Sequence, residues 1–319
     1  MIEIKDLTKD FNTVRAVDHI NLEINEGEVF GFLGPNGAGK TTTIRMLNCL
    51  IKPTSGVAYL DGNSILEDPM KIRKIIGVLT ENPCIYERLS GEYNLKFFGK
   101  LYEIPDEVLK HRIKDLLEKF NLIDRAGDKS GTYSKGMKQK LAIIRTLLHD
   151  PKILIFDEPT AGLDPKASKD LRDYIKMLSN ERKITIFLCT HNLSEAEYLC
   201  DKIAVINNGK IVGIGRPKEL SRMLWSGDRV AITLTDNITQ KNIEMNIEDI
   251  IKRIAGVNEC IIKENRIQIS TENARKINPL IIRKLIESNQ DIVEVKILGH
   301  SLEDIYLSLI KDNNEEKSK

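Results

Sequence analysis

The sequence has almost no surplus of charge of either sign. Its 48 lysines and arginines are balanced by 47 aspartates and glutamates, so the 319 residues carry a formal net charge of +1. Without a basic surplus, no long-range field draws the protein toward nucleic acid. We therefore expect no nucleic-acid partner, and local sites must determine what the protein binds.

Long apolar runs and paired cysteines are also missing. No run approaches the roughly 20 apolar residues that a membrane-spanning helix needs, and the N-terminal stretch MIEIKDLTKDF is too charged for a signal peptide. The five cysteines are odd in number and form no C-x-x-C pair, which favours reduced thiols over a disulfide framework or a zinc site. These absences predict a soluble, cytoplasmic protein.

A change of pattern near residue 225 divides the chain into two regions. In residues 1–225, short alternating segments predict an antiparallel β subdomain, and the apolar runs KILIFDEP and KITIFLCTH predict buried strands of a mainly parallel sheet. Helical spacing indicates a helical subdomain at about 85–140, and Asn208-Gly209 predicts a type I′ hairpin turn. The first region is therefore expected to be an α/β domain.

Residues 229–311 predict a small α+β accessory domain with a βαββαβ order and a terminal helix. We expect Asn278 and Pro279 to begin its second helix, as the N-cap and the first helical residue. Ser301 and Asp304 stand in capping-box positions before the last helix. The tail, residues 312–319, is expected to be disordered.

The stretch GPNGAGKT, from Gly34 to Thr41, predicts a phosphate-binding loop between a strand and a helix. Its glycines allow backbone N–H groups to point inward, and the helix that follows adds its positive end. Lys40 would neutralise the β- and γ-phosphates, and Thr41 would place a hydroxyl on Mg²⁺. The alternative is an ordinary glycine-rich turn before a helix.

The stretch ILIFDEPTAGLD brings Asp157 and Glu158 to the end of a buried strand. Adjacent carboxylates there are costly unless a cation or hydrogen bonds compensate them. Mg²⁺ is the expected compensation for Asp157, and Glu158 is a candidate general base for an attacking water. The alternative is that both residues only cap the strand.

His191 ends another apolar run, and Asn192 and Glu195 after it can begin a helix. A lone histidine at a strand end is usually structural. In an α/β sheet, however, ligands gather at the carboxyl ends of the strands, where Lys40, Asp157 and His191 would all lie. This convergence favours a functional role for His191 over a structural one.

Together these motifs resemble the ATP-binding subunits of ABC transporters, from residue 1 to about residue 220. Asp157 matches the family's Walker B aspartate, Glu158 its catalytic glutamate and His191 its switch histidine. AGLD, ending in Asp164, matches the D-loop, and Phe11 stands where the family places an aromatic residue on adenine. The resemblance implies a P-loop ABC ATPase fold with ATP and Mg²⁺ as cofactors. The loop residues that it assigns to the nucleotide are Gly34, Asn36, Gly37, Ala38, Gly39, Lys40, Thr41 and Thr42.

YSKGM, residues 133–137, stands where the family carries its L-S-G-G-Q signature. The resemblance implies head-to-tail pairing, in which Ser134 and Gly136 complete the ATP site of a second ATPase subunit, in a dimer expected to be of like chains. Lys135 and Met137 depart from the signature. Glu81 stands where the family has a glutamine, and a carboxylate there could still coordinate Mg²⁺.

The resemblance also implies ATP hydrolysis that drives transport through an integral membrane permease, with this subunit peripheral on the inner face of the membrane. The ending GHSLEDIYLSLI is similar to that of drug- and antibiotic-resistance exporter ATPases, which favours export. Residues 82–96 are the expected dock for the permease, or else they pack within the helical subdomain. Two alternatives stay open: a soluble ABC-type ATPase switch, and a ligand-sensing or dimerising role for residues 229–319.

Overall fold

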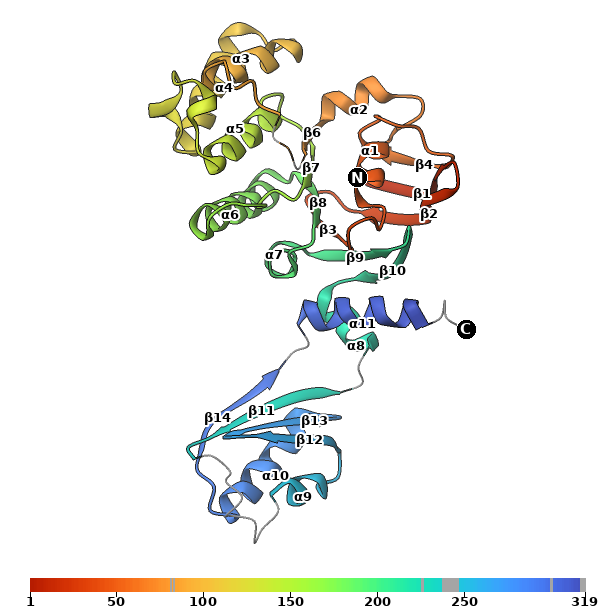
Figure 1. The fold of residues 1–319 in the computed structure, drawn as a ribbon, viewed down its shortest axis with the longest axis vertical. Coiled ribbons are helices and arrows are strands. Elements are labelled where there is room, and N and C mark those ends of the chain that lie inside the picture. Colours follow the sequence, from red (N-terminus) through yellow and green to blue (C-terminus); the bar gives the residue numbers. More distant parts are fainter. Residues whose placement is uncertain (81, 83, 225–226, 237–246, 299–300, 316–319) are drawn as a thin grey trace. The chain divides into compact units, whose positions relative to one another are not determined.

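The computed structural model describes residues 1–80, 82, 84–224, 227–236, 247–298 and 301–315 (Figure 1). The chain forms two compact units. The first comprises Met1–Arg216 together with Leu309–Lys319, and the second comprises Pro217–Ser308. Within the described part of the chain, no helix is long and apolar enough to cross a membrane.

A six-stranded sheet forms the centre of the first unit. Its strands, in spatial order, are β10 (Lys210–Gly215), β9 (Lys202–Asn207), β3 (Val29–Leu33), β8 (Thr185–Thr190), β7 (Ile153–Asp157) and β6 (Ile76–Leu79). All neighbours are parallel except β9 and β10. Every residue of β3, β7 and β8 is buried, because both faces of such a sheet are covered.

The antiparallel β9–β10 pair is the predicted hairpin. Asn207 pairs with Lys210, and the two residues between them have positive φ angles, 49° at Asn208 and 81° at Gly209. Two successive positive φ angles are the condition for a type I′ turn. The hairpin prediction is therefore confirmed.

A second, antiparallel sheet packs in the first unit. Its order is β2 (Val14–Ile24), β1 (Ile2–Phe11), β4 (Ser55–Leu60) and β5 (Asn63–Ser64). One hydrophobic cluster joins Ile4 and Leu22 of this sheet with Phe30 and Phe187 of the six-stranded sheet. The shared core holds the two sheets against each other, which fixes the position of the loop that follows β3.

The helices of the first unit include the predicted helical subdomain. The subdomain consists of α3 (Gly91–Leu101), α4 (Asp106–Lys119) and α5 (Lys135–Leu147), which contact one another (Figure 1). Ser90 and Ser134 cap α3 and α5, because each side chain accepts a hydrogen bond from a backbone N–H of the first turn. The other helices are α1 (Lys40–Leu47), α2 (Pro69–Ile75), α6 (Pro165–Arg182) and α7 (Leu193–Leu199), with short 3₁₀ turns at Ile123–Arg125 and Ser130–Thr132.

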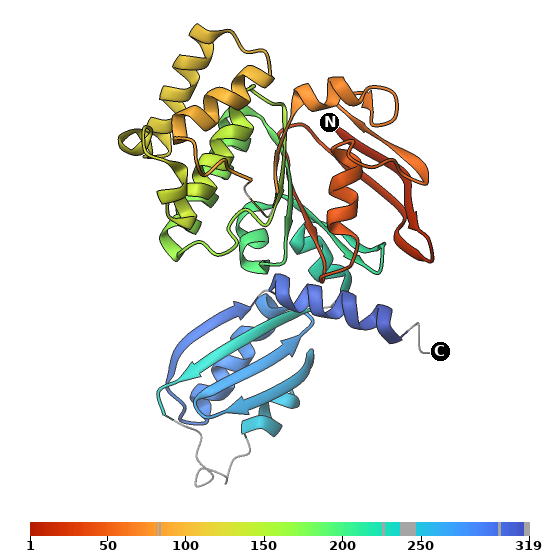
Figure 2. The same cartoon turned by 45° about the horizontal axis from the view of Figure 1, so that its top comes forward.

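The second unit contains a four-stranded antiparallel sheet with helices on one face (Figure 2). Its elements are α8 (Pro217–Leu224), β11 (Asp228–Leu234), α9 (Ile247–Lys252), β12 (Val257–Lys263), β13 (Arg266–Thr271), α10 (Ala274–Glu287) and β14 (Ile292–Leu298). The sheet order is β12-β13-β11-β14. The predicted βαββαβ order is therefore confirmed. The boundary between the units falls inside the last helix, α11 (Leu302–Glu315).

Two helix boundaries in this part of the chain differ from the sequence prediction. The N-cap of α10 is Asn273, whose side chain accepts from the backbone N–H of Lys276, and Pro279 lies inside the helix. Burial of Ala274 and Ile277 on the same stripe as Ile281 explains the earlier start. At α11, Ser301 and Asp304 form the predicted reciprocal capping box, but the helix continues to Glu315, into the expected tail.

Candidate active site

The loop after β3 places backbone N–H groups at the start of α1. Gly39, the residue before the helix, has a φ angle of 113°, and Gly37 has a φ angle of 81° with open space where a side chain would stand. Residues with a Cβ atom rarely adopt these angles. The sequence therefore bends here into a turn whose concave side is lined by backbone, which is the geometry that accepts phosphate.

Lys40 lies at the floor of this loop. Its side chain is buried, and its Nζ atom donates to the carbonyl oxygens of Gly34 at 2.6 Å and Pro35 at 3.0 Å. The loop thus holds a positive charge within itself. A ligand that brings phosphate oxygens into the loop would replace hydrogen bonds to neutral carbonyls with stronger ones in which the acceptor is charged as well as the donor.

Asp157 and Glu158 lie where β7 ends, beside the end of β8. Asp157 pairs in register with Cys189 of β8 and is only 8% exposed. Glu158 has a φ angle of 52°, a left-handed conformation that a residue with a side chain adopts at a cost of about 1–3 kcal/mol. Backbone strain of this kind clusters at functional sites, and here it turns the Glu158 side chain toward His191.

Glu158 and His191 form a close polar pair in the site. The Oε1 atom of Glu158 accepts from the backbone N–H of His191 at 2.8 Å and lies 2.6 Å from its ring Nδ1. The hydroxyl of Thr190 donates to Oε2 at 3.3 Å. The Glu158 side chain is 14% exposed and that of His191 is 68% exposed, so the carboxylate is held from behind while the imidazole faces outward.

These elements surround one cavity of about 250 Å³. It brings together residues of the loop and the start of α1, residues at and after the ends of β7 and β8, and Ala16 from β2. Of the predicted residues, the lining includes Asn36, Gly37, Gly39, Lys40, Thr41, Thr42, Asp157, Glu158 and His191, and it adds Ala16 and Ala161. Nothing in the motifs marked Ala16, because its place depends on how the antiparallel sheet packs over the loop.

The cavity has the ligands that Mg²⁺ prefers. The hydroxyl of Thr41 and the carboxylate of Asp157 are hard oxygen donors in one lining. Among the described residues, no group of three or more His, Cys, Asp or Glu side chains could hold a metal ion. Magnesium is commonly held by one or two protein oxygens together with the phosphates of its substrate, so this sparse donor set fits Mg²⁺ bound with a nucleotide.

Several predicted residues do not line the cavity. Phe11, at the end of β1, is 44% exposed and packs under the Nζ atom of Lys9 at 5.0 Å. Ser134, Gly136 and Asp164 lie at the starts of α5 and α6. Gly34 and Ala38 belong to the loop without lining the cavity. Glu81 lies outside the described residues.

The starts of α5 and α6 nevertheless form one surface. The Asp164 side chain caps α6 by accepting from the N–H of Ala167 at 2.9 Å. Gly136 lies close to α6, because a Cβ atom built on it would stand 3.8 Å from the side chains of both Leu163 and Ala167. Gly162 lies even closer to Lys135, because a Cβ atom built on Gly162 would collide with the Lys135 Nζ atom. Lys135, the departure from the family's signature, therefore lies over the D-loop, a contact that only the folded structure reveals.

Glu195 is a second buried carboxyl group behind the site that the motifs did not identify as functional. Asn192 caps α7 as expected, by accepting from the backbone N–H of Glu195 at 3.1 Å. The residue is fully buried. Burial raises the pKa of the Glu195 carboxyl, and the negative charge of Glu158 raises it further, although the hydroxyls of Thr190 and Thr160 oppose the shift.

The comparisons with known proteins agree with this site. The ABC transporter family model matches residues 17–161. The uncharacterized ABC transporter ATP-binding protein YhcH of Bacillus subtilis is 38% identical over 316 residues, 99% of this chain and 98% of the relative. The bacitracin transport ATP-binding protein BcrA of Bacillus licheniformis is 35% identical over 318 residues, 97% of each chain. Among solved structures, the ATP-binding cassette MJ0796, a dimer in a post-hydrolysis state bound to ADP and Pi, matches with a TM-score of 0.63 and 28% identity, over 68% of this chain and 98% of that one.

Proposed function

The chain belongs to the ABC transporter family as an ATP-binding, ATP-hydrolysing subunit, and we propose that it uses the cavity around Lys40 to drive export through a separate membrane subunit. The observation that carries this proposal is the Glu158–His191 pair, held at 2.6 Å beside the loop lysine in one cavity. A proton acceptor and a cation on the two sides of one small cavity suit the attack of water on a phosphate.

The residue roles follow from the contacts. Glu158 accepts a proton from the attacking water, since its carboxylate is fixed by three donors and remains 14% exposed. Doubly protonated, His191 would donate its Nδ1–H to Glu158 and its Nε2–H to the γ-phosphate. Lys40 balances the charge on the β- and γ-phosphates. Thr41 and Asp157 would hold Mg²⁺, which would further neutralise the phosphate charge when bound.

A second copy completes the site. The surface formed by Ser134, Gly136 and Asp164 carries two helix N-termini and lies outside the cavity lining. In a head-to-tail pair, this surface would contact the γ-phosphate bound by the other copy, where Ser134 and the N–H of Gly136 add donors. Phe11 would stack on adenine, and Glu81 would contribute to the Mg²⁺ site.

A groove in the first unit is suited to the membrane subunit. Its volume is about 830 Å³, and it is lined on one side by α2 and β6 and on the other by α3 and α5. Leu50, Met70 and Leu101 are each more than 60% exposed there, which is costly unless a partner covers them. Of the segment 82–96, Cys84 and Tyr86 line the groove whereas Asn94 and Leu95 are buried in the helical subdomain. Part of the segment thus packs within the helical subdomain, and the other part lines the groove that we propose as the dock.

The direction and location of transport rest on the relatives. The chain matches a bacitracin transport ATP-binding protein over 97% of both chains. This similarity supports export of an antibiotic-like compound and a position on the inner face of the membrane, bound to an integral permease. The residues of the ATP site would be the same for many cargoes, so the cargo is determined by the permease.

The first experiment is to purify the tagged full-length chain from its native membranes in mild detergent and to identify its companions by mass spectrometry. We expect a multi-span membrane protein in near-equal amount. Leu101→Glu, which puts a charge in the groove, should remove this partner, whereas Leu280→Glu on the exposed face of α10 should retain it. Recovery of soluble proteins alone, with ATP hydrolysis intact, would instead favour the cytosolic switch.

A further inference from the structure

The strand β14 forms one edge of the four-stranded sheet in the second unit. It pairs with β11 on one side only, and within the described part of the chain no strand pairs with its outer side. An uncovered edge strand offers unpaired backbone N–H and C=O groups to another strand. This edge is therefore a surface on which a further strand could add.

The edge exposes apolar side chains beside its charged ones. Val293 is 66% exposed and Ile297 is 49% exposed, and Ile286 of the adjacent helix α10 is 60% exposed. Exposed apolar side chains on an uncovered edge strand favour its pairing with another strand. Burying these three side chains against a partner would stabilise the complex by a free energy of about 25 cal/mol for each Å² of apolar area removed from water.

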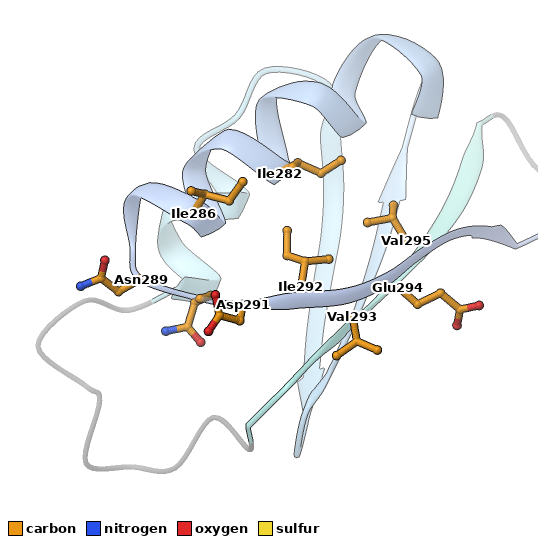
Figure 3. Close-up of a pocket in the computed structure, with 9 residues that line it drawn as sticks. Ile282, Ile286, Asn289, Asp291, Ile292, Val293, Glu294 and Val295 are labelled. Atoms are coloured by element: carbon orange, nitrogen blue, oxygen red, sulfur yellow. The ribbon is translucent and has the colours of Figure 1, made fainter.

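A groove runs beside the same edge, between α10 and β14 (Figure 3). Its volume is about 790 Å³. Figure 3 shows Ile292 and Val295 pointing from the strand toward α10, where Ile282 and Ile286 lie, and Val293 pointing away. Polar residues, among them Asn289 and Asp291, line one end. The groove and the strand edge thus form one continuous surface.

The charges of β14 fit a second copy of the same strand. The strand reads IVEVKIL, with Val295 at its centre. In an antiparallel pair with a two-fold axis at Val295, Glu294 lies opposite Lys296 of the second copy, and Lys296 lies opposite Glu294 of that copy. Apolar residues then meet on both flanks, Val293 with Ile297 and Ile292 with Leu298. The strand is therefore complementary to itself in charge and in hydrophobicity.

Within one copy, Glu294 and Lys296 already interact at 3.4 Å, and both side chains are more than half exposed. They project from the same face of the strand because they are two residues apart. On pairing, the two copies would form a square of four alternating charges. A register slip of one residue in this antiparallel pair would remove both cross-strand ion pairs, so the charges also fix the register.

From these observations we propose that β14 and the α10 groove form an interface between two copies of this chain, joined by antiparallel β14–β14 pairing about Val295. The contact does not involve nucleotide, and it gives the accessory unit the dimerising role that its sequence left open. A bulge leaves Val293 out of register with β11, so regular pairing is centred on Glu294–Lys296. Such a short interface is weak on its own.

The test is a charge exchange measured by sedimentation equilibrium of the full-length protein. Nucleotide is omitted and EDTA is added, so that pairing of the ATP sites does not contribute. The wild type should self-associate in the range of about 10–500 µM. Glu294→Lys and Lys296→Glu should each weaken the association about tenfold, because each puts like charges opposite one another twice. The double variant E294K/K296E restores opposite charges and should restore the association.

The other edge strand, β12, supplies the matched control. Glu259 is also an exposed acidic residue on an edge strand, and Glu259→Lys should leave the self-association unchanged. A wild type that remains monomeric over the whole range would overturn the proposal, and so would a double variant that stays as weak as the singles. Dissociation by E259K alone would overturn it in favour of the β12 edge. None of these outcomes bears on ATP hydrolysis, which is measured separately.

Discussion

The ring Nδ1 atom of His191 lies 2.6 Å from the Oε1 atom of Glu158, and the backbone N–H of His191 donates to the same oxygen at 2.8 Å. One residue therefore fixes the carboxylate twice, once through its ring and once through its backbone. The backbone contact survives any substitution of the side chain. Substitutions can therefore distinguish the roles of the two residues. Loss of Glu158 removes the proton acceptor, whereas loss of the His191 imidazole only loosens the position of the Glu158 carboxylate.

Glu158→Gln should lower the kcat of ATP hydrolysis by about 10²–10⁴-fold, because an amide cannot accept the proton of the attacking water. The shape of the side chain and its contacts with Thr190 are retained, so ATP should still bind. Single-turnover hydrolysis measures the loss of catalysis, and equilibrium binding of a fluorescent ATP analogue measures the retained affinity. Turnover at the parent rate would refute the general-base assignment.

His191→Ala should reduce kcat by a smaller factor, about 10–100-fold, since the backbone N–H still holds Glu158 and only the charge stabilisation by the ring is lost. The matched control is His111→Ala. His111 is an exposed histidine of α4 that does not line the cavity. Steady-state kinetics of both variants provide the measurement. Equal losses in the two variants would mean that His191 has no special role.

Mixing two inactive variants tests the head-to-tail pair. Lys40→Ala removes the loop cation, and Ser134→Glu places a negative charge where the γ-phosphate of the other copy would lie. A mixed dimer has one site with both defects and one site with neither. Random mixing should therefore restore up to about a quarter of the wild-type activity. Activity equal to the sum of the two separate variants would have one of two meanings. Either each chain works alone, or a dimer is inactive unless both of its sites are intact. Cross-linking of the mixed chains would distinguish these cases.

The sequence predicted the parts of this protein whose structure is decided locally. Glycines that need positive φ, a lysine after them and carboxylates at a strand end all have short-range causes, so the loop and Asp157 could be placed before the fold was known. Asn273 was missed as the cap of α10, because Asn278 and Pro279 offer the same local signal. The choice between them depended on burying Ala274 and Ile277 in the core of the second unit.

Contacts between distant segments could not be predicted either, because they too depend on how the folded chain packs. Ala16 reaches the cavity only because the antiparallel sheet packs over the loop, and Lys135 lies over Gly162 only because α5 and α6 begin side by side. The β14 edge is a further case. Its self-complementary pattern is present in the sequence, but a strand pattern alone does not say whether it will be central or at an edge.

Glu195→Gln tests the buried carboxyl behind the site. Its pKa is raised in the folded protein, first by burial, so the folded state binds more protons than the unfolded state between the two pKa values. The contribution of Glu195 to stability must then fall as the pH rises from its unfolded pKa, near 4.5, through its folded pKa. The loss persists at higher pH. A glutamine cannot ionise, so the variant should gain stability relative to the wild type as pH rises. Thermal unfolding at pH 5 and pH 8 measures the difference. A difference independent of pH would mean that Glu195 stays charged in the fold, and that Arg172, whose charge favours ionisation of Glu195, compensates for its burial.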